Sequence, residues 1–164
     1  MPLDSLNWGY CFMNSINIRA YEASDYDEIC LIHDTARKIE LSLASLDDAF
    51  LPFSVASKRE DFFEYPNIDV AIMDGRIVAF SAYTQEELAW LYVSVDKMRH
   101  KIGSAMVERA LQKAPEINYI EVLVGNEPAK KLYESFGFSV HNIAGGVMPG
   151  NESFSVRVYC MARR

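Results

Sequence analysis

The sequence lacks the features that mark several specialised classes of protein. Its apolar runs, such as Ile77–Phe80, are far shorter than the ~18 residues that a membrane-spanning helix needs. Basic residues are also in deficit, because 16 Lys and Arg face 23 Asp and Glu, a net charge of −7. This balance disfavours nucleic acids and anionic membranes as partners and favours cationic ones. We therefore expect no nucleic-acid partner and no membrane partner.

Cysteine and histidine are scarce, with three of each. Cys11, Cys30 and Cys160 are far apart, and no CxxC or HExxH motif offers a set of metal ligands. We expect no metal site, and reduced thiols in a cytoplasmic protein. The first residues lack the basic start and apolar segment of a signal peptide.

The length of 164 residues, half of them apolar, predicts one compact domain with its own hydrophobic core. Residues 1–12 have no clear periodicity, and we interpret them as a poorly ordered N-terminal extension. The domain itself is then expected over residues 13–164. The sequence contains no internal repeat and no low-complexity linker.

Periodicity divides the remainder into strands and helices. Ile16–Ala20 alternates like a strand, and a helix is expected from Ser24, with an inner face formed by Ile29, Ile32, His33 and Ala36. The dipeptide Asp74-Gly75 favours a two-residue hairpin turn between strands 69–73 and 76–83. Further helices are expected within 54–64, 102–114 and 127–136, and further strands at 87–94, 119–124, 138–143 and 154–161. This order predicts an α/β (α+β) fold with a mixed sheet and helices on its faces.

Two turns from strand to helix carry candidate chemistry. After Leu91-Tyr92-Val93, a helix is expected to begin at Ile102-Gly103. The free N–H groups of that first turn, together with the helix dipole, suit an anion such as pyrophosphate. The basic residues Arg99, His100 and Lys101 add positive charge there, although an ordinary loop with solvated basic side chains explains them equally well.

The second turn reads Asn126-Glu127-Pro128-Ala129 and leads to Tyr133 and Gly137-Phe138. Asn126 and Tyr133 are seven residues apart, so both can face one groove. A tyrosine with an ordinary pKa of ~10 is protonated at neutral pH and can donate to a departing anion. The alternative is that Tyr133 is a core aromatic residue.

The string from Asn126 to Phe138 resembles the acetyl-CoA contact helix of the GCN5-related N-acetyltransferase (GNAT) superfamily. The similarity extends back through Leu91-Tyr92-Val93 and Ile102-Gly103-Ser104, and covers residues 16–163. It implies a mostly antiparallel sheet, flanked by about four helices and splayed between strands 4 and 5. It also implies direct transfer of acetyl from acetyl-CoA to an amine, without a metal.

The resemblance implies a set of cofactor-binding residues: Leu91, Tyr92, Val93, Met98, Arg99, His100, Lys101, Ile102, Gly103, Ser104, Asn126 and Ala129. The pyrophosphate motif of the superfamily has Gln or Arg at the position of Met98, Gly at the position of Lys101, and Gly or Ala at the position of Gly103. Only the last position matches. A Cβ at Lys101 narrows the pyrophosphate cradle, which leaves two alternatives: weaker or shifted cofactor binding, or binding retained through the backbone N–H groups that the family mainly uses.

The resemblance also implies the catalytic roles. Glu87 lies eleven residues before Met98, and the general-base glutamate of histone-acetylating relatives has the same offset. The resemblance therefore implies that Glu87 is the general base. The alternative is that Glu87 is only a polar residue at the start of a strand. Tyr133 would donate a proton to the CoA thiolate, and Asn126 would cap the last helix and bond the pantetheine arm.

The only indication of the amine that accepts the acetyl group is the charge of the first third of the chain. Residues 1–56 contain nine acids and three bases, which would attract a small cationic molecule or a basic peptide, unless these acids simply form a solvated helix face. A non-catalytic acyl-CoA-binding or regulatory module is the alternative function. The superfamily further implies a homodimer through the last strands, with Phe154–Tyr159 as the candidate edge.

Overall fold

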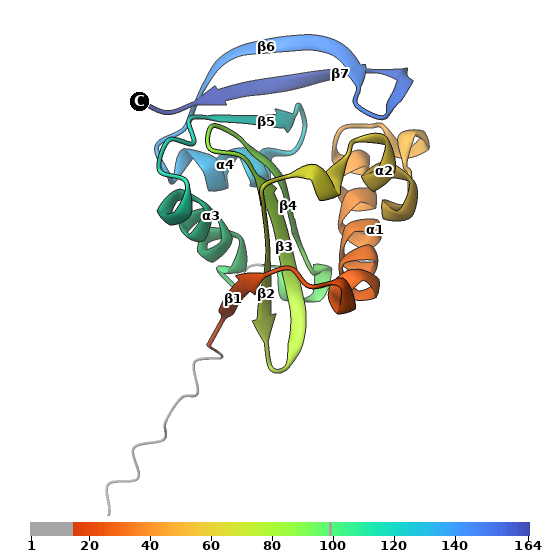
Figure 1. Cartoon of the computed structure of the whole chain (residues 1–164). Coiled ribbons are helices and arrows are strands. Elements are labelled where there is room, and N and C mark those ends of the chain that lie inside the picture. Colours follow the sequence, from red (N-terminus) through yellow and green to blue (C-terminus); the bar gives the residue numbers. More distant parts are fainter. Residues whose placement is uncertain (1–14, 99) are drawn as a thin grey trace, which may run out of the picture.

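The computed structural model describes residues 15–98 and 100–164 (Figure 1). The expected extension over residues 1–12, Cys11 and Arg99 lie outside the described residues. Cys30 is half-buried and Cys160 is buried, and both are free thiols. None of the helices in the described ranges has the length and apolar composition needed to cross a membrane.

Within the described residues, seven strands form two sheets. The first is antiparallel, in the order β1 (Asn17–Ala20), β2 (Asn67–Met73), β3 (Arg76–Tyr83) and β4 (Leu88–Val93). The second has the order β5 (Tyr119–Leu123), β7 (Asn151–Ala162) and β6 (Ser139–Met148). Asp74 and Gly75 both have positive φ, so the predicted hairpin between β2 and β3 is confirmed.

Four helices cover the sheets. In Figure 1, α1 (Tyr26–Leu43) and α2 (Phe53–Arg59) lie on one side of the first sheet, and α3 (Ile102–Lys113) lies on the other. The short helix α4 (Glu127–Glu134) packs under the second sheet. The predicted inner face of α1 is confirmed, because its four residues are buried against the sheet. β3 is apolar and buried on both faces, since helices cover each of them.

The two sheets separate between β4 and β5. In the part of the chain that the structure describes, the only pairing between these strand regions is a parallel bridge from Glu87 to Tyr119. Beyond that bridge β4 is hydrogen-bonded only to β3, and β5 only to β7. The predicted splay and the predicted fold class are therefore confirmed.

One expectation for the last strands is wrong, and a second holds only in part. β6 and β7 extend to a tight turn at Pro149-Gly150, where the Gly, Pro and Asn content predicted a longer loop. The candidate edge at Phe154–Tyr159 is present only in part: β7 is the central strand, and Val158 and Tyr159 are paired on both sides, whereas residues 154–157 have no β5 partner among the described residues. Within the described residues, the edge strands of this sheet are β5 and β6. Backbone pairing of a long hairpin outweighs the weak strand propensity of Gly145 and Gly146.

Candidate active site

Two cavities lie on either side of the splay. The hairpin cavity, about 520 Å³, is enclosed by α1, α2, β4, β5 and the turn of the β6–β7 hairpin. The α3 cavity, about 540 Å³, is enclosed by α1, β4 and the first turns of α3 and α4. The residues that line both cavities define what we call the junction: Glu40, Leu91, Tyr92, Asn126, Ala129 and Tyr133. The two cavities therefore share a wall, and these six residues form it.

The first wall of the α3 cavity is the free edge of β4. Leu91, Tyr92 and Val93 all line it. Because β5 has diverged by this point, the outer backbone groups of these residues have no strand partner among the described residues. Such an edge can donate N–H groups to an extended ligand.

The second wall is the start of α3. Ile102, Gly103 and Ser104 line the cavity, and no side chain within the described residues caps the helix. Its first N–H groups are therefore free to bind an anion. A Cβ on Gly103 would lie 3.1 Å from Leu132 Cδ2, so glycine lets α3 and α4 approach closely.

Of the predicted pair His100 and Lys101, only Lys101 lines the cavity. Lys101 lines the cavity but has φ +61°, a left-handed conformation that favours glycine, at the position where the superfamily has one. Met98 also lines the cavity and is 40% exposed. His100 is exposed and does not line it, and Arg99 lies outside the described residues.

The third wall is α4. The side-chain oxygen of Asn126 accepts a hydrogen bond from the Ala129 N–H at 3.3 Å, so the predicted N-cap is confirmed. Tyr133 is 7% exposed, and burial together with the nearby charge of Glu40 raises its pKa well above the usual value. Its hydroxyl therefore stays protonated at neutral pH.

The hairpin cavity is acidic. Five carboxylates and two guanidinium groups line it: Glu40, Glu60, Glu87, Glu121 and Glu152 with Arg37 and Arg59. Glu87 is half-buried, and its pKa is raised by burial and by the charge of Glu121. Sequence reasoning missed Glu60, at the end of α2. Burial raises its pKa to about 7 despite the opposing charge of Arg37.

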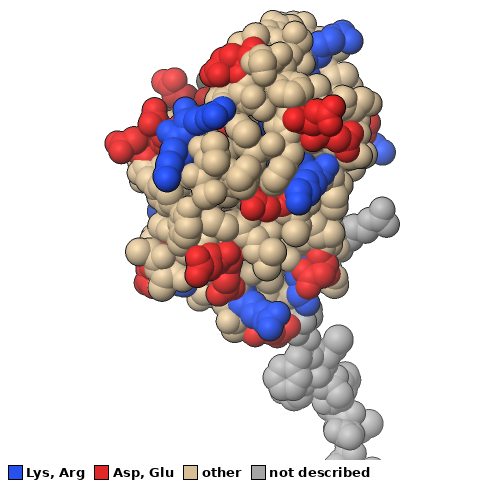
Figure 2. Space-filling model, turned by 90° about the vertical axis from the view of Figure 1, so that its right-hand side faces the viewer, with Lys and Arg blue, Asp and Glu red and all other residues tan. Residues whose placement is uncertain are grey.

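These acids are not the ones that the charge of the first third suggested. Of the eight described acids in that region (nine less Asp4), only Glu40 lines either cavity. Others hold the fold, since Asp25 pairs with Arg19 at 2.7 Å and Glu28 accepts the Ile77 N–H at 2.9 Å. Figure 2, which views the side carrying α1 and α2, shows acidic and basic side chains interspersed with wide uncharged areas.

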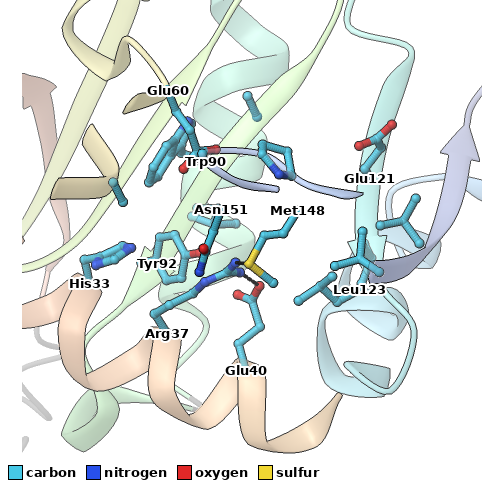
Figure 3. Close-up of a pocket in the computed structure, with 18 of the residues that line it drawn as sticks. His33, Arg37, Glu40, Glu60, Trp90, Tyr92, Glu121, Leu123, Met148 and Asn151 are labelled. Atoms are coloured by element: carbon cyan, nitrogen blue, oxygen red, sulfur yellow. Dashed lines mark hydrogen bonds and ion pairs between the residues drawn. The ribbon is translucent and has the colours of Figure 1, made fainter. Parts of the chain in front are cut away.

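Figure 3 shows the side chains that α1 directs into the hairpin cavity, which sequence reasoning also missed. Arg37 pairs with Glu40, three residues further along the helix, and its Nη2 donates to Met148 Sδ at 3.6 Å. His33 is 2% exposed and bonds Asp34 through Nδ1 at 2.9 Å, and burial lowers its pKa. The i, i+4, i+7 spacing of His33, Arg37 and Glu40 was the available signal.

The turn of the hairpin closes this cavity from above. Arg59 Nη1 donates to the Gly150 carbonyl at 2.9 Å, and Asn151 Nδ2 donates to the Ala49 carbonyl at 3.0 Å. Gly150 has φ +72°, and a Cβ there would lie 3.1 Å from Glu60 Cγ. The turn is thus fixed against the end of α2 and against the segment before it.

Comparison with known proteins gives one family match. The family model described as an acetyltransferase (GNAT) domain matches residues 59–140, which is 82 of the 164 residues. This range contains β2 to β5, α3 and α4, and so includes the splay and most of the α3 cavity. No curated protein sequence matches the chain.

Solved structures share the fold at low sequence identity. The ribosomal-protein-S18-alanine N-acetyltransferase of Escherichia coli is 20% identical, with a TM-score of 0.67 over 91% of this chain and 93% of that one. A GCN5-related N-acetyltransferase from Rhodopseudomonas palustris is 15% identical, with a TM-score of 0.72 over 94% and 99%. The yncA protein of Salmonella typhimurium, solved with its cofactor acetyl-CoA, is 15% identical, with a TM-score of 0.62 over 90% and 92%.

Proposed function

This chain belongs to the acetyltransferase (GNAT) family, and from that premise we propose that it transfers acetyl from acetyl-CoA to the primary amine of a small cationic molecule or peptide. The observation that carries the proposal is the junction, where a cavity that ends on a free helix N-terminus meets an acidic cavity beside a buried tyrosine. Two substrates held in these cavities are brought together in a fixed orientation.

The α3 cavity fits acetyl-CoA, which supplies an activated acetyl thioester when bound. The uncapped N–H groups of Ile102, Gly103 and Ser104 bind the pyrophosphate, with Met98 and Lys101 beside them. The edge of β4 at Leu91-Tyr92-Val93 donates hydrogen bonds to the rest of the cofactor and to the acetyl oxygen. Asn126 and Ala129, at the start of α4, contact the pantetheine arm.

Glu87 and Tyr133 move the protons in this proposal. An ammonium nitrogen loses two protons when it becomes an amide. Glu87 takes the first, directly or through water, because only the neutral amine can attack. Tyr133 gives its hydroxyl proton to the departing thiolate sulfur, and the second proton from nitrogen restores the tyrosine. Glu87 then releases its proton to solvent, which balances the reaction.

The charge of the hairpin cavity supports a cationic acceptor. Five carboxylates against two guanidinium groups give its lining a formal charge of −3, with every carboxylate counted as ionised. An ammonium ion entering this cavity is attracted, whereas an anion is repelled. The cavity volume of about 520 Å³ accommodates a small amine or the end of a basic chain.

The decisive experiment measures acetyl-CoA binding and then thiol release. Calorimetric titration with acetyl-CoA should give saturable heat, and thiol release should follow addition of butylamine, 1,4-diaminobutane, spermidine or a basic peptide with a free N-terminus. Tyr133→Phe should lower kcat about 10²- to 10⁴-fold, because the leaving thiolate loses its acid, while acetyl-CoA affinity stays within threefold.

Three outcomes have separate meanings. No binding of acetyl-CoA would refute the proposed function altogether. Binding without thiol release would indicate the non-catalytic acyl-CoA-binding module instead. Normal turnover by the Tyr133→Phe variant would leave the activity standing but remove Tyr133 as the acid.

A further inference from the structure

The reacting amine must lie at the junction, because only there can a group in the hairpin cavity touch a thioester in the α3 cavity. Of the described residues that line both cavities, Glu40 alone carries a carboxylate. Glu87, by contrast, lines only the hairpin cavity and lies where β4 still meets β5 at Tyr119. Glu40 is therefore the carboxylate closest to the point where the two substrates must meet.

The position of Glu40 is set by an ion pair with Arg37. The two residues are one helical turn apart on α1, and Arg37 Nη1 donates to Glu40 Oε1. Arg37 is held in turn from the opposite side of the cavity by Met148 Sδ, at 3.6 Å. Both side chains are about four-fifths buried, with exposures of 19% and 21%. A carboxylate held in this way has little freedom to move away from the junction.

The second oxygen of Glu40 remains available. No hydrogen bond to Oε2 is found within residues 15–98 and 100–164, and the only partner of the carboxylate is Arg37. A carboxylate has acceptor capacity on both oxygens, so one bond to arginine leaves room for a cationic donor. Figure 3 shows Glu40 and Arg37 pointing together into the cavity from α1.

On the basis of the proposed function, we propose that Glu40 binds the reacting ammonium group of the acceptor through this free oxygen, and that Arg37 is the positioning residue that holds Glu40 in place. Glu40 makes no covalent bond and keeps no proton; it orients the nitrogen toward the thioester while Glu87 removes the first proton. Hydrogen bonds between a carboxylate and a cationic donor are short and strong, which suits this task.

The same carboxylate also acts on Tyr133. The charge of Glu40 contributes, after burial, to the raised pKa of Tyr133. A negative charge beside the phenol disfavours the phenolate, so Glu40 helps to keep the hydroxyl protonated and also makes it a weaker acid.

The test is a steady-state comparison of Glu40→Gln and Glu40→Asp with wild type, using whichever amine of the panel above gives the highest kcat/KM. Removing the charge in Glu40→Gln should raise the KM for the amine about 10- to 100-fold, with the KM for acetyl-CoA unchanged within threefold. Glu40→Asp retains a negative charge that can pair with Arg37, so the variant should fold. Its shorter side chain draws the carboxylate back from the junction. It should show the same selective rise.

Asp27→Asn is the matched control. It removes one carboxylate from the exposed face of the same helix, and both kinetic constants should stay within twofold of wild type. Arg37→Lys should retain more of the amine affinity than Arg37→Met, because only lysine keeps a cation for Glu40. Thermal unfolding of every variant separates loss of fold from loss of binding.

An unchanged KM for the amine in folded Glu40→Gln and Glu40→Asp would overturn this inference while leaving the acetyltransferase function intact. Equal losses for amine and acetyl-CoA would also overturn it, since they would indicate general damage to the junction. A wild-type protein that acetylates none of the four amines would remove the proposed function, and this inference with it.

Discussion

Replacement of Gly125 by alanine tests how the fold positions the junction. Gly125 precedes the cap residue Asn126 and has φ +108°, a conformation that side chains rarely adopt. A Cβ built on it would lie 2.4 Å from the Leu43 carbonyl oxygen and 3.1 Å from Ala44 Cα. The turn from β5 to α4 therefore packs directly against the end of α1, and only glycine fits there.

Two costs add in the Gly125→Ala variant. A side chain held at such a φ costs roughly 1–3 kcal/mol, and forcing the backbones apart costs about 1–3 kcal/mol more. A total of about 4 kcal/mol should lower the Tm by roughly 8–16 °C in a chain of this size. Because Asn126 moves with the turn, we also expect weaker binding of acetyl-CoA.

The assay is thermal unfolding followed by circular dichroism, with Gly146→Ala as the matched control. Gly146 lies in the edge strand β6, has no positive φ, and would place its Cβ where no heavy atom lies within 4 Å. Its Tm should change by less than about 2 °C. If Gly125→Ala unfolds within that same margin of wild type, the close packing of α1 against the turn is not what holds the junction together.

Two further predictions concern single residues of the site. Glu87→Gln should remove the acidic limb of the kcat/KM profile, and Glu121→Gln should move that limb to lower pH, because the charge of Glu121 helps to raise the pKa of Glu87. A limb that survives in Glu87→Gln but disappears in Glu60→Gln would assign the base to Glu60. Lys101→Gly should raise the Tm by about 2 °C. Removal of the strained left-handed side chain stabilises the folded state by ~1–2 kcal/mol, and the greater backbone entropy of glycine in the unfolded chain offsets part of this gain. An unchanged or lower Tm would contradict the strain assigned to Lys101.

Local patterns were sufficient for most of the fold. The inner face of α1 and the Asp74-Gly75 turn follow from side-chain periodicity and from a dipeptide that accepts positive φ, and both are present. The β6–β7 hairpin was harder, because glycines at 145 and 146 predict a loop unless the partner strand is known. Pairing between distant segments decided its length, and no local window contains that information.

The site divides in the same way. The twelve proposed cofactor contacts come from two contiguous segments, and ten of them line the α3 cavity, to which α1 adds a third segment that includes Glu40. Arg37, Glu60 and Met148 come from three separate elements and meet only in the folded chain. Their chemistry depends on burial and on neighbours, as the pKa of Glu60 near 7 illustrates. Sequence spacing could not supply either.

The free edge of β4 connects the fold to the proposed chemistry. Exposed strand edges invite pairing with other chains, and proteins usually cover or interrupt them. Here the edge at Leu91-Tyr92-Val93 is left open by the splay, yet it lines cavities rather than open surface. In the proposed function, an amide-bearing cofactor arm would occupy the place of the missing strand, and the acetyl group that it carries would lie beside Glu40 and Tyr133. Binding of the cofactor would then offset the structural cost of separating β4 from β5.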